Sequence, residues 1–205
     1  MNKKLTMAKK TSPNPYHLFR KWYAEAKRCP EIKYADAMCL STVDPHGDPD
    51  GRIVMLQDVD ESGFLFFTDE NSPKGVSFAA RPKAAVTFYW GVLDRQVRAR
   101  GAVEMLSGDE SQTFFQRRPR RSQITAWASR QSEPLKNDAE LKRQYQKFRE
   151  KFKIVEQIPC PPNWKTYRLC PHSIEFWTAK ASRLHKRRLY TLGGDGIWEV
   201  RLLYP

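Results

Sequence analysis

The sequence predicts an α+β fold in which a closed or nearly closed antiparallel β-barrel carries peripheral helices. Many short apolar and β-branched runs are separated by polar turns, a pattern typical of antiparallel strands. Segments with helical spacing are clustered in blocks, as is usual for α+β folds. The 205 residues contain no internal repeat and can bury one sizeable core. We therefore expect a flexible arm over residues 1–13 and a single domain over residues 14–205.

The first half of the chain contains most of the predicted strands. Residues 16–27 precede them as an amphipathic helix, because Phe19, Trp22 and Tyr23 recur at helical spacing. Residues 73–80 form a second, short helix, with Ser72 as its N-cap and a proline at its first position. The predicted strands of this half span residues 37–43, 51–56, 64–68, 84–90 and 96–105.

The middle of the chain is predicted to be helical. One helix opens at Ser107, a second spans residues 122–129, and a charged third helix spans residues 138–152. Three prolines within residues 159–162 then break the chain. Four further strands complete the set, over residues 166–169, 174–177, 188–191 and 197–202.

The composition indicates a folded protein with an affinity for anions. Hydrophobic residues make up 40% of the chain and aromatic residues 12%, which argues against disorder. The formal net charge of +13 raises the affinity for any polyanion, so nucleic acid must be considered. The charge is spread along the chain, however, without a nucleic-acid-binding motif. A protein that handles phosphorylated small molecules needs several arginines too.

Membrane, metal and disulfide signals are all missing from the sequence. No run of about 18 apolar residues is present, so we expect no membrane span. The first ten residues have no apolar segment of the kind that a secretory signal needs. The cysteines at 29, 39, 160 and 170 form no C-x-x-C pair, which fits neither a zinc site nor a disulfide scaffold. We therefore expect reduced thiols, no metal and a cytoplasmic location.

Two polar clusters in the first half are candidates for phosphate binding. The glycine-rich nucleotide fingerprints are absent, so side chains and strand ends must hold any phosphate. Residues 52–57 place Arg52 at the start of a strand and Gln57 at its end, although an ordinary strand has the same pattern. In the second cluster, Thr68 ends a strand and Lys74 lies in the first turn of a helix. The helix N-terminus adds partial positive charge there and favours a phosphate.

Two further clusters are rich in arginine. Four arginines lie within residues 117–121 and need an anion or solvent to offset their mutual repulsion. A nucleic-acid patch would look similar, and Ser122 could equally be only a helix N-cap. Near the C-terminus, Arg183 and His185 are two residues apart, so on an extended segment both would reach one ligand. The alternative for this last cluster is a solvated basic turn.

Taken together, the four clusters resemble the pyridoxamine 5'-phosphate oxidase family in order and approximate spacing, from about residue 37 to Pro205. The most specific part is the ending that runs from Trp177 through Arg183-Leu184-His185 and Arg187 to the terminal proline. The resemblance implies an FMN-binding split β-barrel, antiparallel and Greek-key-like, that forms a homodimer with two FMN molecules at the subunit interface. It also implies oxidation of pyridoxine or pyridoxamine 5'-phosphate to pyridoxal 5'-phosphate, with O2 as acceptor and H2O2 as product.

The resemblance implies roles for individual residues. Arg183 and His185 would be catalytic and lie over the substrate ring. The substrate phosphate would be held by Arg118 and Ser122, with Gln57 at the position of a family lysine. The residues that would hold FMN are Arg52, Ile53, Val54, Phe67, Thr68, Lys74, Gln96, Gln131, Ser132, Trp177 and Arg187.

Three positions depart from the family pattern. Gln57 replaces the lysine and Phe114 replaces a tyrosine, both of which contact the substrate phosphate in the family. Pro73 replaces an arginine that touches the FMN phosphate. The chain also begins too close to its first helix to supply the family's N-terminal segment over the substrate. Two alternatives therefore stay open: a split-barrel flavin oxidase for another anionic ring, such as a phenazine precursor, or a basic nucleic-acid-binding module.

Overall fold

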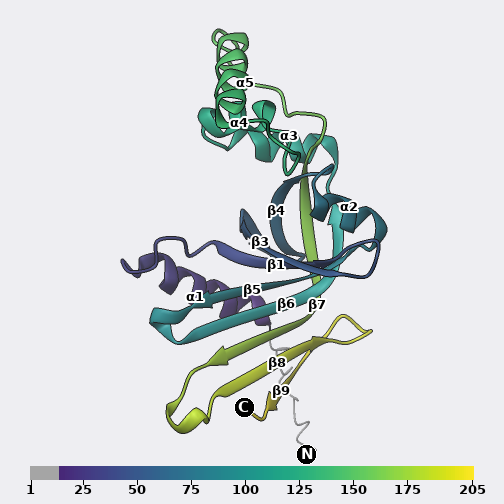
Figure 1. Cartoon of the computed structure of the whole chain (residues 1–205). Coiled ribbons are helices and arrows are strands. Elements are labelled where there is room, and N and C mark those ends of the chain that lie inside the picture. The colour runs from purple at the N-terminus through teal and green to yellow at the C-terminus, as the bar shows by residue number, and fades with distance from the viewer. Residues whose placement is uncertain (1–13) are drawn as a thin grey trace, which may run out of the picture.

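A nine-stranded antiparallel sheet forms the framework of the computed structural model, which describes residues 14–205 (Figure 1). The strand order is β2-β1-β5-β6-β7-β4-β3, and β8 and β9 extend the sheet from β7. The antiparallel prediction is confirmed, whereas the predicted arm over residues 1–13 lies outside the described residues. The strands are β1 (Ala37–Val43), β2 (Pro49–Met55), β3 (Asp58–Asp60), β4 (Gly63–Asp69), β5 (Lys83–Trp90), β6 (Arg95–Met105), β7 (Trp164–Thr178), β8 (Lys186–Leu192) and β9 (Trp198–Leu203).

Strand β7 links the two ends of the sheet. It is 15 residues long and pairs with β6 along one side. Along its other side, its first half pairs with β4 and its second half pairs with β8. Figure 1 shows β7 running from the helical end of the molecule toward the β8–β9 hairpin while the sheet curls around it. Residues at the two ends of β7 therefore belong to different parts of the sheet.

The prediction of two separate strands over residues 166–169 and 174–177 was wrong, because β7 is continuous. Pro171 lies opposite Gly101 of β6, where the register shifts between Arg100 and Gly101. Such a bulge absorbs the irregularity that a proline introduces into a ladder. A Cβ atom on Gly101 would lie 1.9 Å from the carbonyl oxygen of Cys170, so only glycine permits this approach. The three-residue strand β3 was also not predicted.

The main core lies between the sheet and the first helix. The side chain of Asn14 accepts a hydrogen bond from the Tyr16 amide (2.8 Å) and caps this helix. Phe19 is fully buried, with ring centroids 4.9 Å from Phe64 and 5.1 Å from Phe88. The helices are α1 (Pro15–Arg28), α2 (Pro73–Ala80), α3 (Gly108–Gln116), α4 (Arg120–Ala128) and α5 (Asp138–Lys151), with short 3-10 turns at Gly91–Leu93 and Ala181–Arg183.

Helices α3, α4 and α5 gather beyond one end of the sheet around a second apolar cluster (Figure 1). Ser107 opens α3 as predicted and forms a capping box with Glu110. The prediction that α4 starts at residue 122 was wrong, because Pro119 is its N-cap and Arg120 its first residue. The Ser122 amide already donates to the Pro119 carbonyl (2.8 Å), so Ser122 lies inside the first turn. The members of this cluster are Phe115, Ile124, Phe152, Ile158 and Trp164.

Candidate active site

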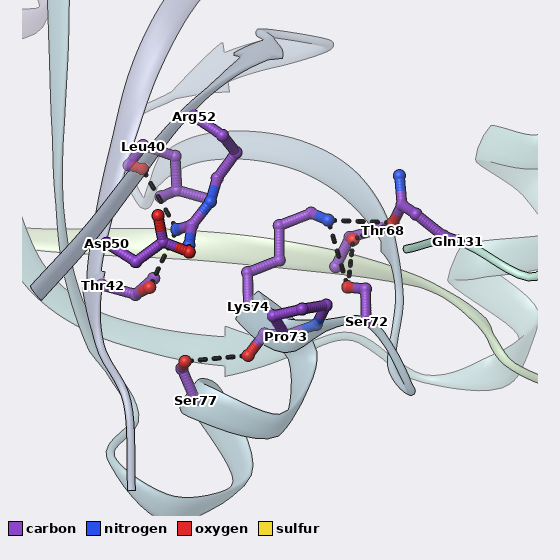
Figure 2. Close-up of polar contacts among 10 residues, drawn as sticks. All are labelled: Leu40, Thr42, Asp50, Arg52, Thr68, Ser72, Pro73, Lys74, Ser77 and Gln131. Carbon is purple, nitrogen blue, oxygen red and sulfur yellow. Dashed lines mark hydrogen bonds and ion pairs between the residues drawn. The ribbon is translucent and has the colours of Figure 1, made fainter. Parts of the chain in front are cut away.

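A buried lysine lies at the centre of the polar cluster that contains Thr68 and Lys74 (Figure 2). Lys74 is 7% exposed, and its ammonium donates to Gln131 Oε1 (2.9 Å) and Ser72 Oγ (3.1 Å). Thr68, near the end of β4, donates its hydroxyl to the same Gln131 oxygen (2.9 Å). We call these four residues the Lys74 cluster. They come from β4, the start of α2 and the loop after α4, so only the fold brings them together.

The Lys74 cluster is electrostatically suited to an anion. Burial, together with repulsion by Arg52, lowers the pKa of Lys74 to about 8, against the attraction of Asp69 and Asp50. The hydrogen-bond partners of its ammonium, Ser72 and Gln131, are both neutral. A buried cation that is bonded only to neutral groups gains stability from a bound anion. The cluster therefore fits a phosphate.

Arg52 adds a second cation beside this cluster (Figure 2). Its guanidinium donates to Thr42 Oγ1 (2.8 Å) and the Leu40 carbonyl (3.2 Å), and it forms an ion pair with Asp50. Thr42 and Leu40 lie on β1, which pairs with β2. These bonds to the neighbouring strand therefore hold the Arg52 guanidinium in place. Its one carboxylate partner is half exposed, so an anion competes with it for the guanidinium.

A cavity of about 200 Å³ lies where the β2–β3 connection, β4, the end of α3 and the α3–α4 connection meet. One guanidinium nitrogen of Arg118, Nη1, is buried there without a hydrogen-bond partner. The guanidinium lies 5.2 Å from the Trp164 ring, and burial lowers the pKa of Arg118. Gln57, half turned to solvent, donates only to the Met55 carbonyl (3.2 Å). The residues that line this cavity, which we call the Arg118 pocket, are Gln57, Phe67, Phe114, Arg117, Arg118 and Pro119.

The Lys74 cluster and the Arg118 pocket are neighbours. An adjoining cavity of about 190 Å³ is lined by Thr68 and Gln131 from the cluster, and by Phe67 and Arg118 from the pocket. Phe67 and Arg118 therefore form the wall between two cationic sites. Such an arrangement can hold two anionic groups at once.

A third group lies across three neighbouring strands. Gln96 of β6 is opposite Trp177 of β7, and Trp177 is opposite Arg187 of β8. Residues that are directly opposite in antiparallel strands share one face, so these three side chains form a row. Arg187 donates to Glu175 Oε1 (2.8 Å) and to the carbonyl of Tyr204 (3.1 Å). We call Gln96, Trp177 and Arg187 the Trp177 row.

The prediction that Arg183 and His185 lie on an extended segment was wrong. Residues 181–183 form a 3-10 turn, in which Ser182 (φ 55°) and Arg183 (φ 60°) have left-handed backbone conformations. Strand alternation therefore does not relate the two side chains. The His185 ring instead lies 4.8 Å from the Trp177 ring, and its Nδ1 accepts from the Lys180 amide (3.2 Å). Two consecutive non-glycine residues in this conformation store strain, which is often found at functional sites.

Four residues with expected roles lie outside these groups. The Ile53 side chain is 65% exposed on the face of β2 opposite Arg52, and Val54 packs against the main core. Ser132 (φ 71°) lines a separate cavity between α4 and α5. Ser122 does not line the Arg118 pocket. Ser72 is the N-cap residue of α2, as predicted, but its hydroxyl bonds the Asp69 carbonyl and Lys74 instead of the α2 backbone.

The Lys74 cluster and the Trp177 row lie near opposite ends of β7. Thr68 pairs with Lys165 near the start of the strand, whereas Trp177 is near its end. At about 3.3 Å per residue, the twelve steps between them span roughly 40 Å along the strand. The two groups of one protomer therefore belong to different parts of the sheet.

Comparisons with known proteins relate this chain to one family. Residues 25–152 match the family described as pyridoxamine 5'-phosphate oxidase, and residues 164–205 match the pyridoxine 5'-phosphate oxidase C-terminal dimerisation region. A pyridoxine/pyridoxamine 5'-phosphate oxidase of a Nostoc species is 44% identical over 193 residues, covering 94% of this chain and 89% of the relative. One from Ralstonia nicotianae, named oxidase 1, is 46% identical over 193 residues, covering 94% and 90%.

This chain belongs to the pyridoxamine 5'-phosphate oxidase family. The solved structure of PhzG from Burkholderia lata, in complex with tetrahydrophenazine-1-carboxylic acid, has a TM-score of 0.87 at 27% identity and covers 94% of both chains. A family-related FMN-binding protein from Nostoc punctiforme has a TM-score of 0.77 at 18% identity, covering 95% of this chain and 100% of that one. The predicted split β-barrel is thereby confirmed.

Family membership makes the chain an FMN-dependent oxidoreductase. The residues present fit that cofactor, because the Lys74 cluster offers a buried cation with neutral partners to a phosphate. The match to a dimerisation region supports a homodimer. Within residues 14–205, no helix combines the length and apolar character needed to cross a bilayer.

Proposed function

We propose that this chain oxidises pyridoxine 5'-phosphate and pyridoxamine 5'-phosphate to pyridoxal 5'-phosphate, with O2 as acceptor and H2O2 as product. The observation that carries this proposal is the pair of adjoining cationic sites, separated by Phe67 and Arg118. An FMN enzyme with a phosphorylated substrate needs two phosphate sites, one for each molecule. The names of the relatives at 44% and 46% identity point to the same substrates.

The Lys74 cluster and Arg52 would hold the FMN phosphate. Lys74 and Arg52 supply two charges, while the Gln131 amide can turn to donate through its nitrogen. The FMN held there would supply the hydride acceptor for the 4' carbon of the substrate and the route for its electrons to O2. The remaining proposed FMN contacts are Ile53, Val54, Phe67, Ser132 and the Trp177 row.

The Trp177 row that completes each FMN site would come from the second subunit. In one chain, roughly 40 Å of strand length along β7 lies between the row and the Lys74 cluster, so one subunit would not bring both groups to one FMN molecule. In a two-fold dimer, each subunit can give one group to each of two equivalent sites. This arrangement makes the dimer a requirement for FMN binding.

The Arg118 pocket would hold the substrate phosphate, with Gln57 at its edge and Ser122 in the adjoining first turn of α4. The unpartnered Nη1 of Arg118 is a donor without an acceptor, and a phosphate oxygen supplies one. Arg183 and His185 would orient the substrate ring, since His185 packs against Trp177 at the flavin end of the site. We place the reaction in the cytoplasm, in keeping with the four free cysteines.

A second candidate substrate is an anionic ring that carries a carboxylate. Gln57 and Phe114 bring no charge to the Arg118 pocket, which reduces the positive charge available to a phosphate dianion. PhzG, of similar fold, was solved with a ring carboxylic acid. The two candidates differ in the charge of the group in this pocket.

Peroxide release separates the candidates. The FMN-loaded protein is assayed with pyridoxine 5'-phosphate, pyridoxamine 5'-phosphate and a dihydro- or tetrahydrophenazine carboxylic acid. We expect turnover of both phosphates, and free pyridoxine serves as a control for the phosphate requirement. If a fully loaded protein oxidises neither phosphate but oxidises the carboxylic acid, the second candidate replaces the first.

A further inference from the structure

We propose that Arg117 is a second substrate-binding cation of the Arg118 pocket and makes that pocket select a phosphate dianion over a carboxylate. This inference rests on the proposed function, because it concerns the anionic group of that substrate. Nothing in the sequence alone distinguishes Arg117 from the neighbouring arginines at 120 and 121.

The lining of the pocket is cationic and aromatic. Its two charged members are Arg117 and Arg118, and no carboxylate lines it. Arg118 is held among aromatic rings, with its guanidinium 5.2 Å from Trp164 and 5.9 Å from Phe67. A single guanidinium neutralises a carboxylate, but a phosphate at neutral pH carries nearly two charges. Arg117 supplies the second positive charge.

The ring of Phe114 holds Arg117 at this position. The Arg117 guanidinium lies 4.9 Å from the Phe114 centroid, within the range of a cation–π contact. Phe114 also lines the pocket, so it places the cation at the pocket wall without competing for its hydrogen bonds. A ring face leaves the N–H donors of the guanidinium edge free for phosphate oxygens. Phe114 is therefore a positioning residue that acts through Arg117.

The other two arginines of this segment, Arg120 and Arg121, have different surroundings. Arg120 donates to the carbonyls of Phe152, Val155 and Glu156, so it ties α4 to the end of α5. Arg121 is exposed and does not line the Arg118 pocket. Arg121 therefore gives a matched control, since its removal changes the net charge equally only a few residues away.

The test compares Arg117→Gln with Arg121→Gln in the FMN-loaded protein. For pyridoxine 5'-phosphate, Arg117→Gln should raise KM by about tenfold or more, with kcat changed less than about twofold, because a charge-assisted contact is lost. For unphosphorylated pyridoxine, kcat/KM should stay unchanged. Arg121→Gln should leave both substrates unaffected. Arg117→Lys and Phe114→Leu should give intermediate KM values, since charge is kept and the stacking is weakened.

A binding measurement keeps this inference separate from the proposed function. With FMN bound at the Lys74 cluster, inorganic phosphate should raise the Tm of the wild type and of Arg121→Gln. It should raise the Tm of Arg117→Gln much less. If the wild type oxidises neither B6 phosphate yet shows this pattern, the proposed function fails and the inference stands. The inference is overturned if Arg117→Gln leaves both the KM and the phosphate-induced Tm shift unchanged. It is equally overturned if Arg121→Gln alters them as much.

Discussion

The ammonium of Lys74 donates to the amide oxygen of Gln131 across 2.9 Å, although the two residues are 57 positions apart. Gln131 lies in the loop after α4, and Lys74 lies in the first turn of α2 (Figure 2). The bond connects the helical end of the molecule to the barrel. It also gives the buried ammonium a neutral partner that a phosphate can replace or join.

FMN affinity should depend on pH through Lys74. The folded pKa of about 8 lies below the ordinary 10.5, so the ammonium is charged below pH 8 and becomes neutral as the pH rises through it. Phosphate binding needs the charged form, so the Kd for FMN should rise above pH 8. Fluorescence quenching by the apoprotein at pH 7, 8 and 9 measures this, and Lys74→Met should bind more weakly with a flatter profile.

The lowered pKa of Lys74 also affects stability. As the pH rises, FMN binding should weaken, whereas the free energy of unfolding should increase. Between pH 8 and 10.5, the unfolded chain holds a proton on Lys74 that the folded apoprotein does not. The contribution of Lys74 to the free energy of unfolding should therefore rise with pH across this window. Urea unfolding of the wild type and Lys74→Met at pH 7.5 and 9.5 checks the sign. A wild type that gains no stability relative to the variant would contradict it.

Arg52 and Asp50 should affect FMN binding in opposite directions. Arg52→Ala removes a charge-assisted contact and should raise the Kd for FMN, with a loss of about 1.5–3 kcal/mol in binding free energy. Asp50→Asn frees the guanidinium from its ion pair while its bonds to Thr42 and Leu40 keep it in place, so the Kd should fall. Parallel titrations of both variants measure this. If Asp50→Asn weakens binding as much as Arg52→Ala, Arg52 does not contact the phosphate.

Mixed dimers should reveal whether each FMN site uses two subunits. Lys74→Met damages the Lys74 cluster and Arg187→Ala damages the Trp177 row, so each variant alone should bind FMN poorly. After the two variants are mixed, unfolded and refolded together, about a quarter of the sites should be intact, because half of the dimers are mixed and carry one complete site. Bound FMN after gel filtration measures this. Sites formed within one chain would give no recovery.

Gln57→Lys should strengthen the binding of a substrate phosphate. Gln57 lines the Arg118 pocket and its amide bonds only the Met55 carbonyl, so a lysine there adds a charge without breaking a buried contact. The KM for pyridoxine 5'-phosphate should fall more than kcat changes, because phosphate binding is largely uniform between ground and transition states. Steady-state peroxide assays measure both constants. A change confined to kcat would argue against a phosphate in this pocket.

Local patterns in the sequence determined the elements and the identity of the cationic clusters. The helical spacing in α1, the helix start at Ser107 and the strands of the first half other than β3 depend on neighbours within a few residues, and each appears close to where it was predicted. The order of the four clusters was sufficient to indicate the family, because that order is itself a property of the sequence.

Only the tertiary structure decided which of those residues meet. Long-range pairing made β7 continuous through Pro171, and the length of that strand separated the Lys74 cluster from the Trp177 row. Burial by segments distant in sequence set the Lys74 pKa and left Arg118 Nη1 without a partner. Packing between these segments also directs the Arg120 side chain to backbone carbonyls, whereas Arg117 lines the Arg118 pocket. These outcomes depend on packing and desolvation between distant segments, which local sequence patterns do not encode.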